Sequence, residues 1–533
     1  MDLFYNFILN LKGEKLVNKL EIKYLIGGSA FFMGVILNGC GGGNSSFAQT
    51  SELDSGVFNQ ELIINNDNKP LLNFITGTNS TESSVQITLN NISKSRVENI
   101  KLSLPQKFSL NRAGTNSCEI FDHQLVSGTL EPKSSCNLIV TYNDPSVINK
   151  TIASLEMSYN IGNYNNHKAQ SYELYYSTIT KDFQWQLLGN SEQSRGDNFI
   201  GAWTAIRKLG KVPGESVTIA VIDTGYTPHL NYISNFYESE SGVYGYDFKE
   251  ESKLDGLDSG DFVAQNECGE STPARNSGWH GSHVTGMIVG NGLDRIYGGA
   301  YGAKVVPIRA LGKCGGTISS VGDSIMWAIN EHPTSANPHP VDIINLSLGG
   351  EGECPQLYQD AIDQALAKNV IVVVSAGNST DDVSKYRPAN CKGVISVAAL
   401  AAKNKLSSYS NYGNTSIAAA GGDGRSDGSQ SILSAIWNSK EGFNRIDGGS
   451  YGGKSGTSMA APSVSAAIAD IISLMKAYNN PYTPEIIEEI IKNSAQSDFQ
   501  KYSTDLSKSI TSKRLDVESA VKYTINNYLK INN

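Results

Sequence analysis

Buried-strand patterns alternate with helical patterns from about residue 181 to the C-terminus. Five runs of apolar, often β-branched residues each have the length of one strand: VTIAVID (217–223), AKVVPI (303–308), VDIINLSL (341–348), VIVVVSA (370–376) and VISVAAL (394–400). Runs that are apolar on both faces are typical of a parallel sheet covered by helices on both sides. Helical periodicity intervenes at 318–331 and 356–369, and Thr483 followed by Pro484 marks a late helix start. The pattern predicts a doubly wound α/β domain over residues 181–533.

A different pattern, of short alternating segments, fills residues 56 to 178. Hydrophobic and polar residues alternate in SSVQITLNN (83–91), CNLIVTYND (136–144) and SYELYYS (171–177), with turns rich in Asn, Gly, Ser and Pro between the segments. Alternation with a period of two places one face of each strand on a core and the other in solvent. Strands at this spacing predict an all-β, immunoglobulin-like sandwich over residues 56–180. Cys118 and Cys136 lie in this block, and we expect them to pair across neighbouring strands.

The N-terminal segment has the features of an export signal. Several lysines precede an apolar run over residues 24–37, which as a helix would span about 21 Å, less than the roughly 30 Å of a hydrocarbon core. A signal peptide over residues 1–39 is therefore favoured over a membrane span. Leu37-Asn38-Gly39-Cys40 resembles the bacterial lipobox, in which the cysteine is lipidated; the alternative is an ordinary signal peptide that contains a cysteine. We expect a lipid anchor at Cys40, a flexible tether over residues 40–55 and a place on the cell envelope. The residue after the cysteine is not Asp, which favours the outer membrane.

Composition excludes some classes of function. Lys and Arg number 43 against 52 Asp and Glu, a formal net charge of −9 without a long basic block, so nucleic-acid binding is disfavoured. Of seven cysteines, six remain if Cys40 is lipidated, and an even number in an exported chain indicates disulfides, with many connectivities open. There is no Cys-x-x-Cys or His-Glu-x-x-His spacing, so no zinc site is predicted.

Three short motifs carry the residue types of nucleophilic catalysis. Asp223 ends the run VTIAVID, where a buried carboxylate needs a partner. His280 opens the small-residue segment HGSHVTG. Ser458 lies in GTSMAAP, where a Gly-rich loop becomes a helix, so that its hydroxyl is exposed near converging backbone N–H groups. A carboxylate, an imidazole and a hydroxyl in one hydrogen-bonded row activate the hydroxyl as a nucleophile.

The chain order Asp, His, Ser resembles that of subtilisin-like serine proteases, and the resemblance covers the whole predicted α/β domain. Hydrolases with a Gly-x-Ser-x-Gly elbow have the order Ser, Asp, His instead. The resemblance implies that Ser458 attacks a peptide carbonyl, that His280 transfers the proton and that Asp223 orients the imidazole. It also implies that Asn378, in SAGN (375–378), binds the oxyanion together with the Ser458 N–H. The expected protein is a monomeric serine endopeptidase that requires no cofactor and cleaves extended or unfolded polypeptides.

The resemblance also implies substrate-binding positions. These are segments that pair, strand-like, with the substrate backbone: Gly315, Gly316, Ser347, Leu348 and Gly349. The alternative interpretation is a tight turn and a strand end. Tyr386-Arg387-Pro388 is expected near the primary pocket, where relatives have smaller residues, which leaves the side-chain preference open.

The same resemblance suggests two further disulfides and a calcium site. The disulfides are Cys268–Cys314 and Cys354–Cys391. Asp255, Asp258 and Asp261 are candidate calcium ligands because family members often bind calcium; the alternative is an acidic surface loop. Ser282 and Thr285 depart from the usual Thr and Ala around the catalytic histidine, but both changes are small.

Two competing functions have weaker support. Residues 448–455, GGSYGGKS, satisfy the P-loop pattern, but a polar stretch precedes them where that motif needs a buried strand. We interpret the match as a coincidence. A binding protein that uses a protease fold as a scaffold is the other alternative, and an intact triad argues against it. His283, close to His280, is expected to make structural hydrogen bonds.

Overall fold

The structure is a computed structural model and describes twenty segments of the chain. They are residues 62–65, 71–77, 83–105, 107–113, 116–122, 125–126, 129–142, 151–161, 164–168, 172–179, 184–189, 196–239, 242–249, 278–292, 296–312, 314–333, 335–423, 431–437, 449–501 and 505–529. The predicted signal peptide, Cys40 and the tether lie outside these residues.

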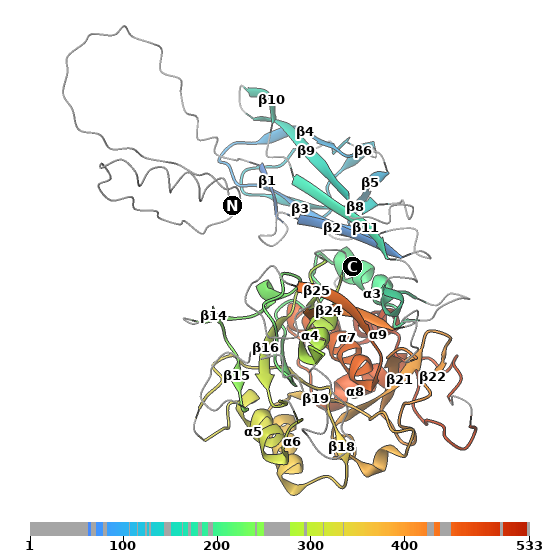
Figure 1. Ribbon diagram of the computed structural model, residues 1–533. Coiled ribbons are helices and arrows are strands. Elements are labelled where there is room, and N and C mark those ends of the chain that lie inside the picture. Colours follow the sequence, from blue (N-terminus) through green and yellow to red (C-terminus); the bar gives the residue numbers. More distant parts are fainter. Residues whose placement is uncertain are drawn as a thin grey trace, which may run out of the picture. The chain divides into compact units, whose positions relative to one another are not determined.

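Two β-sheets share one hydrophobic core in the N-terminal region (Figure 1). The first has the order β1 (Leu62–Asn65), β3 (Ser83–Asn91), β8 (Ser135–Tyr142), β5 (Phe108–Arg112). The second has the order β10 (Tyr164–Lys168), β9 (Thr151–Ile161), β11 (Tyr172–Ile179), β2 (Leu71–Gly77), and β4 (Val97–Ser103) also pairs with β9. A short hairpin joins β6 (Ile120–Asp122) and β7 (Leu125–Val126). All these pairs are antiparallel except β2 with β11, which run parallel. The immunoglobulin-like assignment and the domain boundaries stay predictions.

The alternating pattern of β3 explains how this core forms. Val85, Ile87 and Leu89 are buried in the shared core. Every second residue of a strand points to the same face, so three apolar residues in this pattern give one buried face. The predicted disulfide Cys118–Cys136 is present, with Cys118 buried and Cys136 packed against the same core.

A mainly parallel sheet forms the centre of the C-terminal region. Its order is β15 (Tyr246–Asp247), β16 (Lys304–Arg309), β12 (Thr218–Asp223), β17 (Ile343–Leu346), β19 (Ile371–Ser375), β21 (Ile395–Ala401), β22 (Lys405–Leu406), and β23 (Ile417–Ala420) also pairs with β21. Only the β21–β22 pair is antiparallel among the described pairs of this sheet. All five predicted strand runs lie in it.

Helices cover both faces of this sheet (Figure 1). Along β12, Ile219 and Val221 point into one core and Ala220 and Ile222 into the other. The first core contains α3 (Phe199–Lys208), α4 (His280–Val289), α7 (Thr457–Ala477), α8 (Pro484–Ser494) and α9 (Val517–Asn527). The second contains α5 (Ile318–Ala328) and α6 (Gln356–Ala367). Since each strand is apolar on both faces, the sheet needs cover on both, and the predicted doubly wound α/β fold is confirmed.

Among the described residues, α7 is the one helix long and apolar enough to cross a bilayer by length and composition. In the structure 94% of its most apolar window is buried inside the protein. Its composition is thus accounted for by its place in the first core.

The topology places one end of the sheet at the position of a site. After β12, the chain adds β16 on one side of this strand and β17 on its other side. In open parallel sheets, such a reversal of strand order leaves a crevice at the carboxyl ends of the strands. Asp223 ends β12 and Ser347 follows β17, so both lie at that edge.

Candidate active site

The Asp223 carboxylate and the His280 imidazole are directly hydrogen-bonded. The Asp223 side chain is fully buried, and His280, the first residue of α4, is 24% exposed. His280 Nδ1 lies 2.8 Å from one carboxylate oxygen and 3.0 Å from the other, which leaves Nε2 available to the cleft. The start of α4 lies close to the segment after β12, where the Gly281 N–H donates to Thr224 Oγ1 at 2.9 Å. Position 281 has room only for glycine, because an added Cβ would lie 2.1 Å from the Gly225 carbonyl oxygen.

Ser458 is the second residue of α7, at the helix N-terminus. Its hydroxyl donates to the Ser347 carbonyl oxygen at 3.2 Å, and the Ser347 hydroxyl donates to the Ser458 carbonyl oxygen at 2.9 Å. Within the described residues, Ser458 makes no hydrogen bond to His280, although both line the same cleft. The resting serine is therefore held by a main-chain carbonyl of the neighbouring segment.

A series of buried side-chain hydrogen bonds supports the segment that contains Ser347. Ser465 Oγ, about two turns after Ser458 in α7, donates to Asn345 Oδ1 at 2.8 Å, and Asn345 Nδ2 donates to Ser347 Oγ at 3.0 Å. Asn345 and Ser465 are completely buried, so each hydrogen bond satisfies a group that would otherwise be desolvated without a partner. Sequence reasoning missed both residues. Their only signal was a polar residue inside an apolar strand and another inside an apolar helix.

Asn378 lies three residues after the end of β19, beside the start of α7. Its Oδ1 accepts hydrogen bonds from the N–H and the hydroxyl of Thr457, both at 2.9 Å. The Gly377 N–H donates to Thr457 Oγ1 at 3.1 Å. With the amide oxygen fixed in this way, the Nδ2 group is the free end of the side chain, next to Ser458 in the cleft lining.

Asn411 holds the loop that carries Asn378. Its Oδ1 accepts from the N–H groups of Ser379 and Asp381, at 2.9 and 3.2 Å, and its Nδ2 donates to the Ala376 carbonyl at 2.9 Å. Asn411 is fully buried, and Gly377, at φ 105°, leaves no room for a Cβ because the Asn411 amide nitrogen would lie 2.3 Å from it. This role could not be predicted from the sequence, since Asn411 lies in a loop without a motif.

A cleft of about 680 Å³ joins these groups. The sequence-predicted residues that line it are His280, Ser458, Asn378, Gly315, Gly316, Ser347, Leu348 and Gly349. Tyr386, Arg387 and Pro388 line it too. Asp223 lies behind His280 and is not part of the lining. Apolar lining residues that sequence reasoning missed are Leu311, Ile318, Val321 and Tyr358. The helical pattern of α5 and α6 does not distinguish a cleft-facing residue from a core residue.

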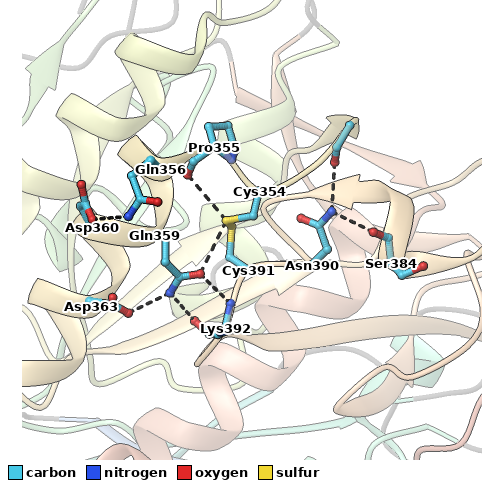
Figure 2. The surroundings of a disulfide bond; sticks show 11 residues. Cys354, Pro355, Gln356, Gln359, Asp360, Asp363, Ser384, Asn390, Cys391 and Lys392 are labelled. Atoms are coloured by element: carbon cyan, nitrogen blue, oxygen red, sulfur yellow. Dashed lines mark hydrogen bonds between the residues drawn. A yellow bond between two sulfur atoms is a disulfide. The ribbon is translucent and has the colours of Figure 1, made fainter.

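The Cys354–Cys391 disulfide cross-links the segment that follows the cleft-lining residue Glu351 to the segment that follows the cleft-lining residue Pro388 (Figure 2). Next to it, Gln359 of α6 binds the backbone of Lys392 from both sides: Oε1 accepts from the N–H at 2.9 Å and Nε2 donates to the carbonyl at 3.2 Å. Cys314 is also disulfide-bonded, while Cys268, its predicted partner, lies outside the described residues. The two segments are thus linked covalently, and the second is also hydrogen-bonded to α6.

Of the two small departures around the histidine, Ser282 has local partners, whereas the buried Thr285 hydroxyl has no hydrogen-bond partner among the described residues. Ser282 Oγ accepts from the Thr227 N–H at 2.9 Å and lies 3.1 Å from the Thr227 hydroxyl, which ties α4 to the segment after β12. His283 is fully buried, and its Nε2 lies 3.0 Å from the Ile432 carbonyl and 3.1 Å from that of Gly452. Burial holds the pKa of His283 well below its ordinary value, so the ring is neutral and its role is structural.

The other sequence signals have no place in this site. Residues 449–454 of the P-loop pattern form β25 (Gly449–Lys454), paired antiparallel with β24 (Ile432–Trp437), so they are not a loop that opens a helix. Asp255, Asp258 and Asp261 lie outside the described residues. Among the residues that are described, no group of three or more His, Cys, Asp or Glu is placed to hold a metal ion.

The sequence profile of the Subtilase family matches residues 214–516, a stretch that includes Asp223, His280, Asn378 and Ser458. The chain belongs to the subtilase family. The resemblance inferred from the order of the motifs is thereby confirmed, and the α/β region is the part of this subtilase that the family profile covers.

Individual relatives agree with the family assignment. The chain is 40% identical over 315 residues to an extracellular protease of Xanthomonas campestris pv. campestris, a match covering 57% of this chain and 50% of the relative. It is 35% identical over 326 residues to an extracellular basic protease of Dichelobacter nodosus, covering 58% and 51%. Each match therefore spans about half the length of the curated relative. Among solved structures, proteases from Pseudoalteromonas arctica PAMC 21717 are similar, with a TM-score of 0.56, 36% identity and coverage of 64% of this chain and 97% of that chain.

Proposed function

We propose that this subtilase is a serine endopeptidase in which Ser458 is the nucleophile, His280 the general base and Asp223 the residue that orients the imidazole. The observation that carries the proposal is the buried Asp223–His280 hydrogen bond at the edge of the cleft that Ser458 also lines. A buried carboxylate bonded to Nδ1 fixes the tautomer in which Nε2 accepts a proton. That is the arrangement which acyl transfer through a serine requires.

Catalysis would begin with a rotation of the Ser458 side chain. In the resting structure the hydroxyl donates to the Ser347 carbonyl, and a turn about the Cα–Cβ bond redirects it toward Nε2 of His280. Hydrogen bonds of this kind often form only once substrate is bound. Ser458 Oγ then attacks the peptide carbonyl while His280 takes its proton. The imidazolium returns that proton to the leaving amine, and water hydrolyses the acyl-enzyme by the same route.

The oxyanion would be bound by Asn378 Nδ2 and by the N–H of Ser458. Support comes from the two Thr457 hydrogen bonds that fix Asn378 Oδ1 and from the helix N-terminus that carries Ser458. Donors that are already oriented stabilise the developing charge without reorganisation. In subtilisin, loss of the side-chain donor costs about 10²–10³-fold in turnover, and we expect Asn378→Ala to have an effect of this size.

The proposed substrates are extended polypeptides. Ser347–Gly349 and Gly315–Gly316 line the cleft at two edges where a substrate backbone can pair as an added strand. Residue Gly315 has open space above its Cα, so a substrate chain meets no side chain there.

For the protein as a whole, we propose export and attachment to the cell envelope through lipidated Cys40, with an immunoglobulin-like domain between anchor and protease. The lipobox-like sequence and the extracellular relatives support this. Cell fractionation of the wild type and of Cys40→Ser tests it: the variant should leave the membrane fraction. An unchanged distribution would refute the anchor.

Labelling with a fluorophosphonate, combined with casein cleavage, tests the enzymatic proposal. The wild type and Ser455→Ala should be labelled and active, because Ser455 lies in the same loop but its hydroxyl contacts only Ser431, at 3.5 Å, in the described chain. Ser458→Ala should be neither labelled nor active, and His280→Ala should lose about 10⁶-fold in turnover, the loss known for subtilisin. Equal labelling of Ser458→Ala and wild type would remove Ser458 from its role.

A further inference from the structure

Arg387 is a charged residue of the cleft lining whose side chain has no hydrogen-bond or ion-pair partner among the described residues. Arg387 ends β20 (Tyr386–Arg387), which pairs antiparallel with β18 (Gly350–Glu351), and it is half-buried. In the described part of the chain, its guanidinium makes neither a hydrogen bond nor an ion pair, whereas Arg309, Arg207 and Arg514 each bond to a side chain. A half-buried positive charge without a counterion is poorly compensated, so a ligand that supplies one is favoured.

The Arg387 guanidinium lies next to the backbone of Gly352, the residue after β18. Arg387 Nη1 lies 2.0 Å from the position that a Cβ atom would occupy at residue 352, which is a glycine. Burial raises the pKa of the Tyr358 phenol, and the positive charge of Arg387 partly offsets that rise, which places the charge near this cleft-lining ring. The guanidinium is therefore next to Gly352 and close to the Tyr358 ring, and Arg387 is itself a residue of the cleft lining.

Further hydrogen bonds hold the backbone of the β18–β20 strand pair, which carries Arg387. The Gly352 N–H donates to the Lys385 carbonyl at 2.7 Å, and Asn390 Nδ2 donates to the carbonyls of Gly352 and Ser384, at 3.0 and 2.9 Å. The Cys354–Cys391 disulfide, shown in Figure 2, joins the segments that follow the two strands. The backbone that carries Arg387 is thus fixed before substrate arrives, so only the arginine side chain remains to be ordered on binding.

The other charged groups of the cleft do not neutralise this one. Among the described lining residues, only His280, Glu351 and Arg387 have side chains that can carry a charge near neutral pH. Glu351 is exposed and forms no ion pair with Arg387, although its strand is the direct neighbour. Since water screens an exposed charge more than a half-buried one, Arg387 should dominate the selection of charged side chains.

We propose that Arg387 is a specificity-determining residue, which makes the protease prefer a carboxylate side chain, Asp or Glu, at the substrate residue whose carbonyl is attacked. Ser347–Gly349 and Asn378 border the position of that carbonyl, and Arg387 lines the same cleft. The side chain of this substrate residue enters the cleft, where its carboxylate can meet the guanidinium in a bidentate pair. The inference rests on the proposed role of Ser458 as the nucleophile.

Matched fluorogenic peptides that differ only at this residue test the proposal. The substrates carry Glu, Gln, Leu or Lys there, and kcat/KM is measured for the wild type, Arg387→Gln, Arg387→Lys and Arg387→Glu. The control variant Glu351→Gln removes the other cleft charge. Active-site titration with a fluorophosphonate normalises each preparation, so a misfolded variant, or an inactive protease, is recognised separately from a change in specificity.

The wild type should prefer Glu over Gln by about ten-fold, the ratio expected for a partly screened ion pair. Arg387→Gln should abolish that ratio with little change for Leu, Arg387→Lys should keep part of it, and Arg387→Glu should reverse it in favour of Lys. Glu351→Gln should retain the preference. A wild type that cleaves Glu and Gln peptides equally, or an Arg387→Gln variant that keeps the full ratio, overturns the proposal.

Discussion

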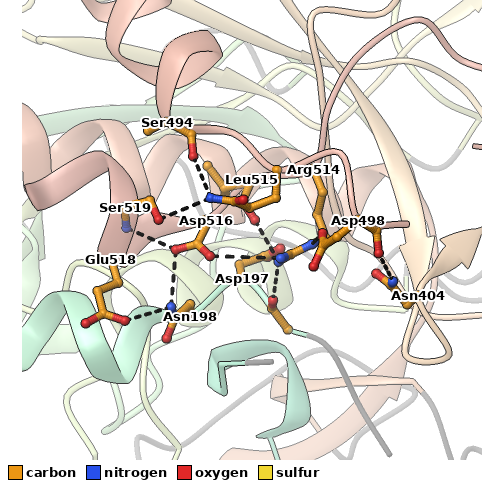
Figure 3. Close-up of polar contacts among 12 residues, drawn as sticks. Asp197, Asn198, Asn404, Ser494, Asp498, Arg514, Leu515, Asp516, Glu518 and Ser519 are labelled. Atoms are coloured by element: carbon orange, nitrogen blue, oxygen red, sulfur yellow. Dashed lines mark hydrogen bonds and ion pairs between the residues drawn. The ribbon is translucent and has the colours of Figure 1, made fainter. Parts of the chain in front are cut away.

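We expect Asp197 to make the stability of the α/β region depend on pH. Its carboxylate is fully buried at the start of the domain and accepts from the Ala420 N–H at 3.0 and 3.2 Å. Arg514 is nearby, but its charge is shared with Asp498 and Asp516, at 3.3 and 3.9 Å (Figure 3). Burial raises the pKa of Asp197 from 3.8 to about 7, against the opposing effects of the Ala420 hydrogen bond and of Arg514.

The sign and size of the effect follow from these two values. Below about pH 4, Asp197 is protonated in both the folded and unfolded states and no stability is lost. As the pH rises toward 7, the unfolded chain ionises while the folded one does not, so the free energy of unfolding falls. The loss is complete above pH 7, and at about 1.4 kcal/mol per pH unit it amounts to roughly 4 kcal/mol.

Replacement by asparagine should remove this slope. Asp197→Asn keeps an acceptor for the Ala420 N–H but cannot ionise. Relative to wild type, its free energy of unfolding should therefore rise by roughly 4 kcal/mol between pH 4 and pH 8. Urea unfolding in a Ser458→Ala background, which prevents autolysis, measures this. The tryptophans all belong to the catalytic region, so their fluorescence follows that domain: Trp185, Trp203, Trp279, Trp327 and Trp437.

A non-ionisable neighbour supplies the control. Ser519→Ala removes the 3.3 Å hydrogen bond from Gln496 beside the same cluster and leaves every carboxyl side chain in place. It should shift stability by about 1 kcal/mol or less, equally at all pH values. If the difference between Asp197→Asn and its parent is the same at pH 4 and pH 8, Asp197 is not the source of the slope and the reasoning fails.

Three further substitutions test the supports of the site. Asn411→Ala leaves two backbone N–H groups and a carbonyl without partners, and we expect about 3 kcal/mol of lost stability in urea unfolding, with lower turnover. Gly281→Ala places a methyl group 2.1 Å from the Gly225 carbonyl oxygen; kcat should fall about 10²-fold, and unchanged kinetics would contradict the close approach. Ser465→Ala leaves Asn345 Oδ1 without its donor, so the free energy of unfolding should drop by about 1–2 kcal/mol. Ser465→Thr keeps the hydroxyl and should lose less stability; calorimetry measures both variants.

Local patterns were sufficient to predict the α/β fold and the ends of the elements that carry the site. Successive residues of β12 are apolar, so burial on both faces could be inferred from this one strand. Asp223 at the end of that strand and Ser458 at a loop-to-helix junction were visible as breaks in these patterns. Thr483 and Pro484 begin α8 as predicted, because N-capping depends on neighbouring residues only.

The sequence alone thus determined which residue types lie at the ends of strands and helices, because periodicity, caps and glycines act over a few residues. Only the tertiary structure decided which of these groups meet. The Ser458 hydroxyl rests on Ser347, 111 residues away, and the loop of Asn378 depends on Asn411. The face to which Arg387 turns depends on a strand pair and a disulfide. Contacts between distant segments depend on packing and burial in three dimensions, and neither has a period that can be found along the chain.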